Sequence, residues 1–235
     1  MGRPRKRPRC RTVALVGVDG SGKTSLAKAL LNDPPLPIKY LYMGASIESS
    51  NIALPSSRLA HRWKVYRYNK ALRAQGRHPT DQITLDGVEH QVDRRGRLAA
   101  TLRLFRRVSE EAYRQLVSWT YQGLGFVVLY DRHFVFDALP LRSDHSEHRL
   151  SERLHHWFLR NLYPKPALAV FLDAPTTVLL SRKQDVPKER LQRDRGRILE
   201  QRALAGTFVH VDATLAQEEV VRTVRDLIAE HCSEG

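Results

Sequence analysis

The segment from Gly17 to Thr24 constrains the fold of this chain more than any other part of its sequence. It reads Gly-Val-Asp-Gly-Ser-Gly-Lys-Thr and matches the pattern GxxxxGK[ST]. The apolar run Thr12 to Val16 precedes it, and the helical run Ser25 to Leu31 follows. Strand, glycine loop and helix in this order form a cradle in which backbone N–H groups and the helix N-terminus face one anion. The motif therefore predicts a phosphate-binding loop at the end of the first strand.

The predicted ligand of this loop is a phosphate chain with Mg²⁺. Lys23 would reach the terminal phosphates, and Thr24 would place its hydroxyl oxygen on the magnesium, which prefers oxygen ligands. The residues of the loop that we expect to contact nucleotide are Gly17, Asp19, Gly20, Ser21, Gly22, Lys23, Thr24 and Ser25.

Five short apolar runs, mostly of β-branched and aromatic residues, are separated by helical patterns. This arrangement is typical of buried parallel strands alternating with helices. The runs are Thr12 to Val16, Ile38 to Tyr42, Phe126 to Tyr130, Ala167 to Leu172 and Thr207 to Val211. They predict an α/β fold with a parallel five-stranded sheet of the P-loop NTPase type and helices on both faces.

Three amphipathic helices are predicted between and after these strands. The first spans Leu98 to Gln122, ends at Gly123 and carries apolar residues at three- and four-residue steps. Leu150, Leu154, Trp157, Phe158 and Leu162 indicate the second helix in the same way. The last helix is expected to begin at Thr214, capped by its own hydroxyl, with Gln217 three residues later.

Length and charge set the domain organisation. The chain has 235 residues, of which 42% are hydrophobic, so one α/β domain over residues 12–235 is expected. Residues 1–11 are expected to form a disordered basic tail, and residues 45–97 a basic helical insertion. Between residues 58 and 107, thirteen Lys or Arg stand against four Asp or Glu, which favours an anionic ligand or surface. The only cysteines, Cys10 and Cys232, make no disulfide framework and fit a reducing cytoplasm.

The run Phe126 to Tyr130 ends on Asp131, and ligands of parallel sheets collect outside the carboxyl ends of the strands. Asp131 is therefore expected beside the phosphates, where it would hold Mg²⁺ directly or through water. Arg132 would grip an oxyanion of the acceptor. Two alternatives stay open: Asp131 caps a turn, or Asp173 at the end of the next run supplies the metal carboxylate.

Four segments in this order resemble the thymidylate kinase-like P-loop kinases. They are Gly17 to Thr24, Asp131-Arg132-His133, Leu172-Asp173 with Leu180 and Arg182 following, and Val211-Asp212-Ala213. The resemblance implies a parallel five-stranded core, ATP and Mg²⁺ as the phosphoryl donor, and a mobile basic lid over the phosphates. It also implies that Asp19 touches the acceptor sugar, that Arg132 holds the acceptor phosphate, and that Arg182 belongs to the nucleotide site.

Residues 182–200 are crowded with arginine and lysine and are predicted to form that lid. Phosphoryl transfer needs positive charge near the moving group, and the glycine loop contains no arginine. Arg190 and Arg193 are therefore the predicted catalytic arginines, which act with Lys23, Asp131 and Arg132. The alternative is a charged helix in which Glu189, Asp194 and Glu200 are the partners of the basic residues.

The predicted function is transfer of the γ-phosphoryl group of ATP to a nucleoside monophosphate, such as dTMP. In thymidylate kinases a phenylalanine and an arginine on the helix before the aspartate strand engage the acceptor. Phe105 with Arg106 or Arg107 could stand in for them, although the spacing from Asp131 puts that arginine near Glu110. A non-nucleotide acceptor stays open, and so does a nucleic-acid or membrane-surface binding module that uses ATP as a conformational ligand. A homodimer also stays open, as does contact of the basic tail with an anionic surface.

Overall fold

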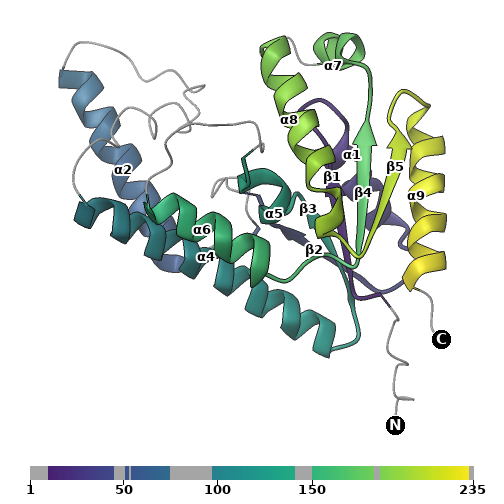
Figure 1. The fold of residues 1–235 in the computed structure, drawn as a ribbon, viewed down its shortest axis with the longest axis horizontal. Helices are drawn as coiled ribbons and strands as arrows, with labels where there is room; N and C mark the ends of the chain where they lie inside the picture. Colours follow the sequence, from purple (N-terminus) through teal and green to yellow (C-terminus); the bar gives the residue numbers. More distant parts are fainter. Residues whose placement is uncertain are drawn as a thin grey trace.

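The computed structural model describes residues 10–44, 51–52, 54–74, 97–140, 150–182 and 186–232. At its centre lies a parallel sheet with the strand order β2-β3-β1-β4-β5 (Figure 1). The strands are β1 (Thr12–Val16), β2 (Ile38–Tyr42), β3 (Val127–Asp131), β4 (Leu168–Asp173) and β5 (Thr207–Asp212). The predicted α/β fold and its five strands are confirmed, although β3 and β4 are shifted by one residue and β5 extends by one.

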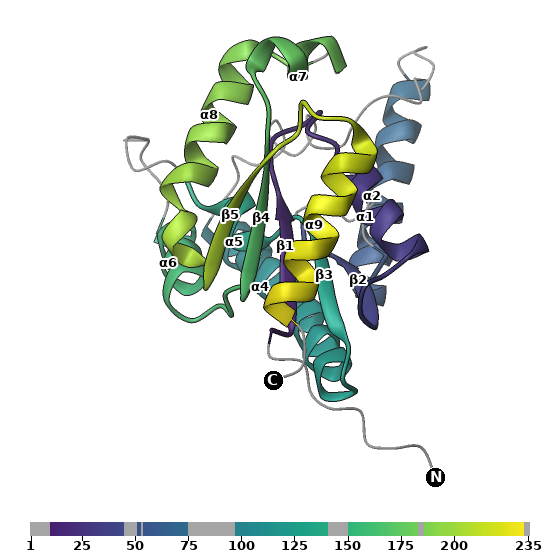
Figure 2. The same ribbon diagram turned by 90° about the vertical axis from the view of Figure 1, so that its right-hand side faces the viewer.

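Helices cover both faces of the sheet, which buries the central strands β1, β3 and β4 and explains their unbroken apolar runs (Figure 2). On one face lie α1 (Lys23–Asn32) and α9 (Gln217–Cys232). On the other lie α4 (Arg97–Gly123), α5 (Phe134–Ala138) and α6 (Leu150–Asn161). The remaining helices are α2 (Pro55–Ala74), α7 (Thr176–Arg182), α8 (Lys188–Glu200) and a 3₁₀ turn (Arg202–Leu204). No described helix is long and apolar enough to cross a membrane.

Helix α4 turns its polar side, not its apolar side, towards the sheet. The buried polar residues of this helix are Glu110, Glu111, Arg114, Gln115 and Ser118. The apolar residues Leu102, Phe105, Leu116 and Trp119 are exposed, and so are Leu150, Leu154 and Trp157 of α6. Polar partners inside the fold satisfy the inner side chains of these helices: Glu111 pairs with His155, and Ser118 bonds to Tyr130.

The start of the last helix also differs from the prediction. Helix α9 begins at Gln217 rather than Thr214. The backbone N–H and the hydroxyl of Thr214 both donate to Asp212 Oδ1, at 2.8 and 2.7 Å. Thr214 is thus held in a turn closed by the aspartate and cannot cap the helix.

Several predicted segments lie partly outside the described residues. These are residues 1–9 of the basic tail, residues 45–50, 53 and 75–96 of the basic insertion, and residues 183–185 of the lid. Most of the described part of the insertion is the helix α2.

Candidate functional site

The glycine loop between β1 and α1 has the backbone that a phosphate cradle requires. Gly20 and Gly22 have φ angles of 84° and 87°, which glycine adopts without steric cost. A Cβ on Gly17 would lie 2.6 Å from Ser21 Oγ and 2.7 Å from the carbonyl oxygen of Leu172, so no larger residue fits there. Helix α1 begins directly after Gly22, and its free N–H groups lie at the loop.

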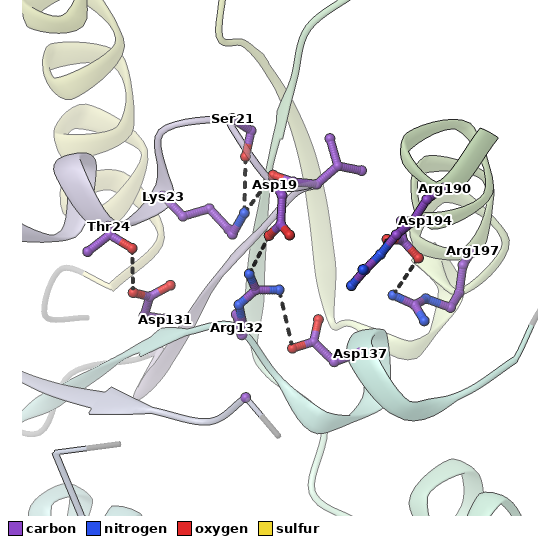
Figure 3. A network of polar contacts seen from close by, with 12 residues as sticks. Asp19, Ser21, Lys23, Thr24, Asp131, Arg132, Asp137, Arg190, Asp194 and Arg197 are labelled. Atoms are coloured by element: carbon purple, nitrogen blue, oxygen red, sulfur yellow. Dashed lines mark hydrogen bonds and ion pairs between the residues drawn. The ribbon is translucent and has the colours of Figure 1, made fainter. Parts of the chain in front are cut away.

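Lys23 is buried against this loop. Its Nζ donates to the carbonyl oxygen of Val18 at 2.7 Å and to Ser21 Oγ at 3.2 Å (Figure 3). Burial, together with the nearby charge of Arg132, lowers the pKa of Lys23 to about 8, against the opposing effect of three aspartates. Negative charge on a bound phosphate would stabilise the buried ammonium group of Lys23. The site therefore favours an anion.

Asp131 is the last residue of β3 and lies buried beside the loop. Its Oδ2 accepts hydrogen bonds from Thr24 Oγ1 at 3.2 Å and from the Tyr40 hydroxyl at 3.0 Å. A threonine hydroxyl and a carboxylate that converge beside a phosphate cradle are the donor set expected for Mg²⁺, which takes its other ligands from phosphate and water. Among the described residues no three His, Cys, Asp or Glu side chains could share a metal ion. Tyr40 was not predicted, because it comes from β2, 91 residues away in sequence.

Arg132 adopts a left-handed backbone with φ of 68°, the one such non-glycine residue in the part of the chain that the structure describes. This conformation is costly for a residue with a Cβ, and such strained residues cluster at functional sites. Its guanidinium donates to Asp19 Oδ1 at 2.6 Å and lies 3.8 Å from Asp137 Oδ2 (Figure 3). Burial acts in the opposite direction, but the two aspartates raise the pKa of Arg132 further above its usual value. A Cβ on Gly44 would lie 2.7 Å from Arg132 Cδ, so glycine is needed there.

Asp137 is a site residue that the sequence prediction missed. It lies on the short helix α5, directly after the Asp-Arg pair. Burial raises the pKa of its carboxyl group, and the positive charges of Arg132, Arg197 and Lys23 only partly oppose this. A carboxyl group of this kind beside a phosphate site is suited to accepting a proton. A carboxylate one helical turn beyond the Asp-Arg pair is the sequence signal that could have drawn attention to it.

The basic side chains of α8 are only partly placed as predicted. Arg190 and Arg197 face Asp137 and Arg132 across the site, and both pair with Asp194, at 3.8 and 3.1 Å (Figure 3). Arg193 and Arg182 are exposed and make no hydrogen bond or ion pair to this network among the described residues. The structure thus brings in Arg197 rather than Arg193. The alternative of a charged helix with internal ion pairs is also partly correct, since Asp194 pairs with Arg190 and Arg197.

Asp173 anchors α8 to the sheet. Its carboxylate accepts two hydrogen bonds from Arg195, at 2.8 and 2.6 Å, and one contact of 2.9 Å from His210 Nε2. Burial acts in the other direction, but the ion pair with Arg195 and the contact with His210 lower the pKa of Asp173. The carboxylate is therefore already occupied, and the geometry favours Asp131 over Asp173 as the metal residue. Beside this anchor lies an open hollow of about 610 Å³, lined by the ends of β4 and β5.

Arg114 of α4 contacts the segment after β2 that lies beside Arg132. It is fully buried, donates to the carbonyl oxygen of Gly44 at 2.7 Å, and pairs with Glu110 at 3.0 Å. The other carboxylate oxygen of Glu110 accepts from the backbone N–H of Leu54, so the pair joins α4 to the segments after β2 and before α2. Phe105, which with Arg106 or Arg107 could stand in for the acceptor residues, lies on the exposed face of α4.

We expect Arg114→Met to lower the free energy of unfolding by about 3–5 kcal/mol, because the carboxylate of Glu110 would stay buried without its partner. Equilibrium urea unfolding measures this change. The matched variant Arg190→Ala removes an arginine whose side chain is 61% exposed, and it should shift the unfolding free energy by less than about 0.5 kcal/mol. Equal effects of the two variants would show that the buried pair has no special structural role.

Comparison with known proteins identifies the architecture. No protein-family model and no curated protein matches the sequence. Among solved structures, the chain is similar to a deoxyadenosine kinase from M. mycoides with the products dCMP and a flexible dCDP bound. The TM-score is 0.55 at 12% identity, over 93% of this chain and 99% of that one. The same enzyme with bound dCTP gives a TM-score of 0.50 at the same identity and coverage.

The chain shares the α/β fold of these solved structures, with a parallel five-stranded sheet between layers of helices. The likeness covers nearly the whole of both chains. At 12% identity it shows the architecture, and the resemblance to thymidylate kinases in particular stays a prediction.

Proposed function

We propose that this protein is an ATP- and Mg²⁺-dependent phosphotransferase whose acceptor is a nucleoside monophosphate. The observation that carries the proposal is the meeting of two segments more than 100 residues apart: the glycine loop, with Lys23 and Thr24, and the strand end, with Asp131 and Arg132. The glycine loop suits a donor triphosphate, and the strand end with Arg132 suits an acceptor anion.

The residues of the site would position the donor and the acceptor and neutralise the charge of the phosphates. These two effects supply most of the catalysis in phosphoryl transfer. The loop backbone and Lys23 would hold the donor phosphates. Thr24 and Asp131 would hold Mg²⁺, which neutralises charge on the phosphates when it is bound. Arg197 and Arg190 would stabilise the negative charge that spreads over the phosphoryl group as it moves.

Arg132 is the proposed ligand of the acceptor phosphate. Its guanidinium already holds one carboxylate, Asp19, at hydrogen-bond distance, and a phosphate oxygen has the same charge and similar geometry. A phosphate that binds there would lie between Lys23 and α8, within the group of positive charges. Asp19, shared between Arg132 and the acceptor, would contact the sugar of the acceptor.

A deoxynucleoside is the second candidate acceptor, and the position of Asp137 favours it. A hydroxyl acceptor loses a proton during transfer, whereas a phosphate acceptor is already ionised at neutral pH. Asp137 lies next to Arg132, and the raised pKa of its carboxyl makes it a better proton acceptor than an ordinary aspartate.

The first experiment is to measure ADP and phosphorylated product with ATP and Mg²⁺ on two panels, the common nucleoside monophosphates and the corresponding deoxynucleosides. Product from a monophosphate supports the proposal, and product from a deoxynucleoside alone supports the second candidate. If neither panel yields product although ATP binds, both proposed classes of acceptor are wrong.

Two variants separate the candidates further. With a monophosphate acceptor, Arg132→Gln should raise the KM for that acceptor by about 10- to 100-fold, the value of a hydrogen bond to a charged group. With a deoxynucleoside acceptor, Asp137→Asn should lower kcat by about 100-fold or more and leave KM nearly unchanged. A monophosphate kinase in which Arg132→Gln leaves the KM for the acceptor unchanged would contradict the role given to Arg132.

A further inference from the structure

Helix α2 carries a line of large apolar side chains on its outer side. Leu59, Trp63 and Tyr66 follow one another at steps of four and three residues and are 70%, 61% and 63% exposed. Val65 and Tyr68, on the other side of the helix, are half-buried. The helix lies at the edge of the molecule in both views (Figures 1 and 2). The apolar line therefore faces solvent and not the core of the fold.

The charges of this helix are all positive. Its 20 residues include six Lys or Arg and no Asp or Glu. Exposed basic side chains flank the apolar line, with Arg62 and Arg73 on one side, Arg67 on the other, and Lys70 at its end. The guanidinium carbon of Arg67 lies 4.9 Å from the ring centroid of Trp63, so the charges and the rings form one surface. We define the α2 face as Leu59, Arg62, Trp63, Tyr66, Arg67, Lys70 and Arg73.

This combination of side chains matches the chemistry of an anionic bilayer surface. Tryptophan and tyrosine place an apolar ring beneath the lipid headgroups and a polar tip among them, and leucine adds apolar area. Long basic side chains bury their stems in the same layer and return their charge to the anionic headgroups. An apolar centre with basic flanks is the pattern of helices that lie in the plane of a membrane surface.

We propose that the α2 face binds an anionic membrane surface, with α2 in the plane of the headgroups and Leu59, Trp63 and Tyr66 directed into the lipid. The formal charge of +14 on the whole chain adds a long-range attraction to such a surface. The short-range part of the binding comes from the apolar line, which the charge of the chain does not supply. The proposal concerns where the protein works, and it holds whichever acceptor is phosphorylated.

Two other partners fit the α2 face less well. A second copy of the chain would bring the same four positive charges against one another, which is unfavourable. A single-stranded nucleic acid would satisfy these charges and stack on the rings. It would make no use of the exposed Leu59, however, and Arg67 already lies over the ring of Trp63. A lipid surface uses both the charges and the apolar side chains.

Flotation of the full chain with lipid vesicles tests the proposal. We expect binding to phosphatidylcholine vesicles that contain about 30% phosphatidylserine, and binding at least about tenfold weaker to pure phosphatidylcholine. The double variant Leu59→Ala with Trp63→Ala keeps every charge and should bind the anionic vesicles at least about tenfold more weakly. The control Trp157→Ala removes a similarly exposed tryptophan from α6 and should bind like the wild type. A wild-type chain that does not bind anionic vesicles overturns the proposal, and so does undiminished binding of the double variant.

A matched pair of charge variants separates the α2 face from the overall charge of the chain. Arg62→Glu with Arg73→Glu reverses two charges on the α2 face, whereas Lys28→Glu with Arg222→Glu makes the same change on exposed residues of α1 and α9. The first pair should weaken binding to the anionic vesicles at least about tenfold more than the second. Equal losses would mean that net charge alone drives the binding, which would overturn the proposal.

Fluorescence quenching tests whether Trp63 enters the lipid. The chain has three tryptophans, so Trp63 reports alone when Trp119→Phe and Trp157→Phe are combined. Lipids brominated in their acyl chains should then quench its emission at least about twofold in anionic vesicles. A chain that binds these vesicles without quenching would contradict the proposal. Tighter binding to single-stranded oligo-dT than to the vesicles, lost in the Leu59→Ala and Trp63→Ala double variant, would assign the α2 face to nucleic acid instead. None of these readouts depends on phosphotransferase activity.

Discussion

Replacing Lys23 with methionine is expected to lower phosphoryl transfer by roughly a thousandfold, and to raise the free energy of unfolding near neutral pH by roughly 1–3 kcal/mol. Transfer falls because the positive charge at the phosphates is lost. Stability rises because methionine fills a similar volume without placing a charge in a buried position.

The pH dependence of the free energy of unfolding tests separately whether burying the charge of Lys23 is unfavourable. The pKa of Lys23 is about 8 in the folded chain and near its ordinary value of 10.5 when unfolded. Between these values the unfolded chain binds more protons, so the contribution of Lys23 to stability becomes less unfavourable as the pH rises from about 8 to 10.5. The advantage of the methionine variant should be largest below pH 8 and shrink through that window. Values of kcat/KM should also fall above about pH 8, where free Lys23 loses its proton.

Chemical denaturation at several pH values, together with an ADP-release assay, measures both effects. Lys28→Met is the matched control, since Lys28 is an exposed lysine on the same helix, and it should change neither activity nor stability appreciably. A Lys23→Met chain that transfers phosphate at the wild-type rate would falsify the proposed function. A variant that is inactive and also less stable at pH 7 would contradict only the burial argument.

Asp131→Asn is expected to lower transfer by roughly a hundred- to a thousandfold and to remove the effect of Mg²⁺ on nucleotide binding. The amide keeps the size of the side chain but loses the charge that would attract the metal. Titration with a fluorescent ATP analogue, with and without Mg²⁺, reads the metal dependence directly and does not rely on activity. The wild-type chain should bind the analogue more tightly with Mg²⁺, and the variant should bind it equally in both conditions.

Two comparisons make this result specific. Tyr40→Phe removes one hydrogen bond to Asp131 Oδ2 and should have a smaller effect, up to about tenfold. Asp226→Asn changes an exposed aspartate on α9 and should have none. If Mg²⁺ strengthens nucleotide binding equally in the Asp131→Asn chain, another residue holds the metal.

The sequence by itself determined the sheet and the phosphate loop, because both depend on local patterns. A parallel strand covered on both faces must be apolar throughout, so its position can be read directly, as for Thr12 to Val16. The glycine loop is equally local, since Gly17, Gly20 and Gly22 are required by the backbone of one short turn. Asp131 could be placed beside the loop because the carboxyl ends of parallel strands meet at one edge.

Only the tertiary structure decided which side chains complete the site and which way the helices face. Tyr40 reaches Asp131, and Arg114 reaches Gly44, across 91 and 70 residues of sequence. Helical periodicity shows that α4 has an apolar side and a polar side, but it does not say which of them meets the sheet. Here the polar side is inside, because Arg114 and Glu111 find buried partners on other elements. Such pairings depend on the spatial arrangement of distant segments, and no local pattern of residues specifies that arrangement.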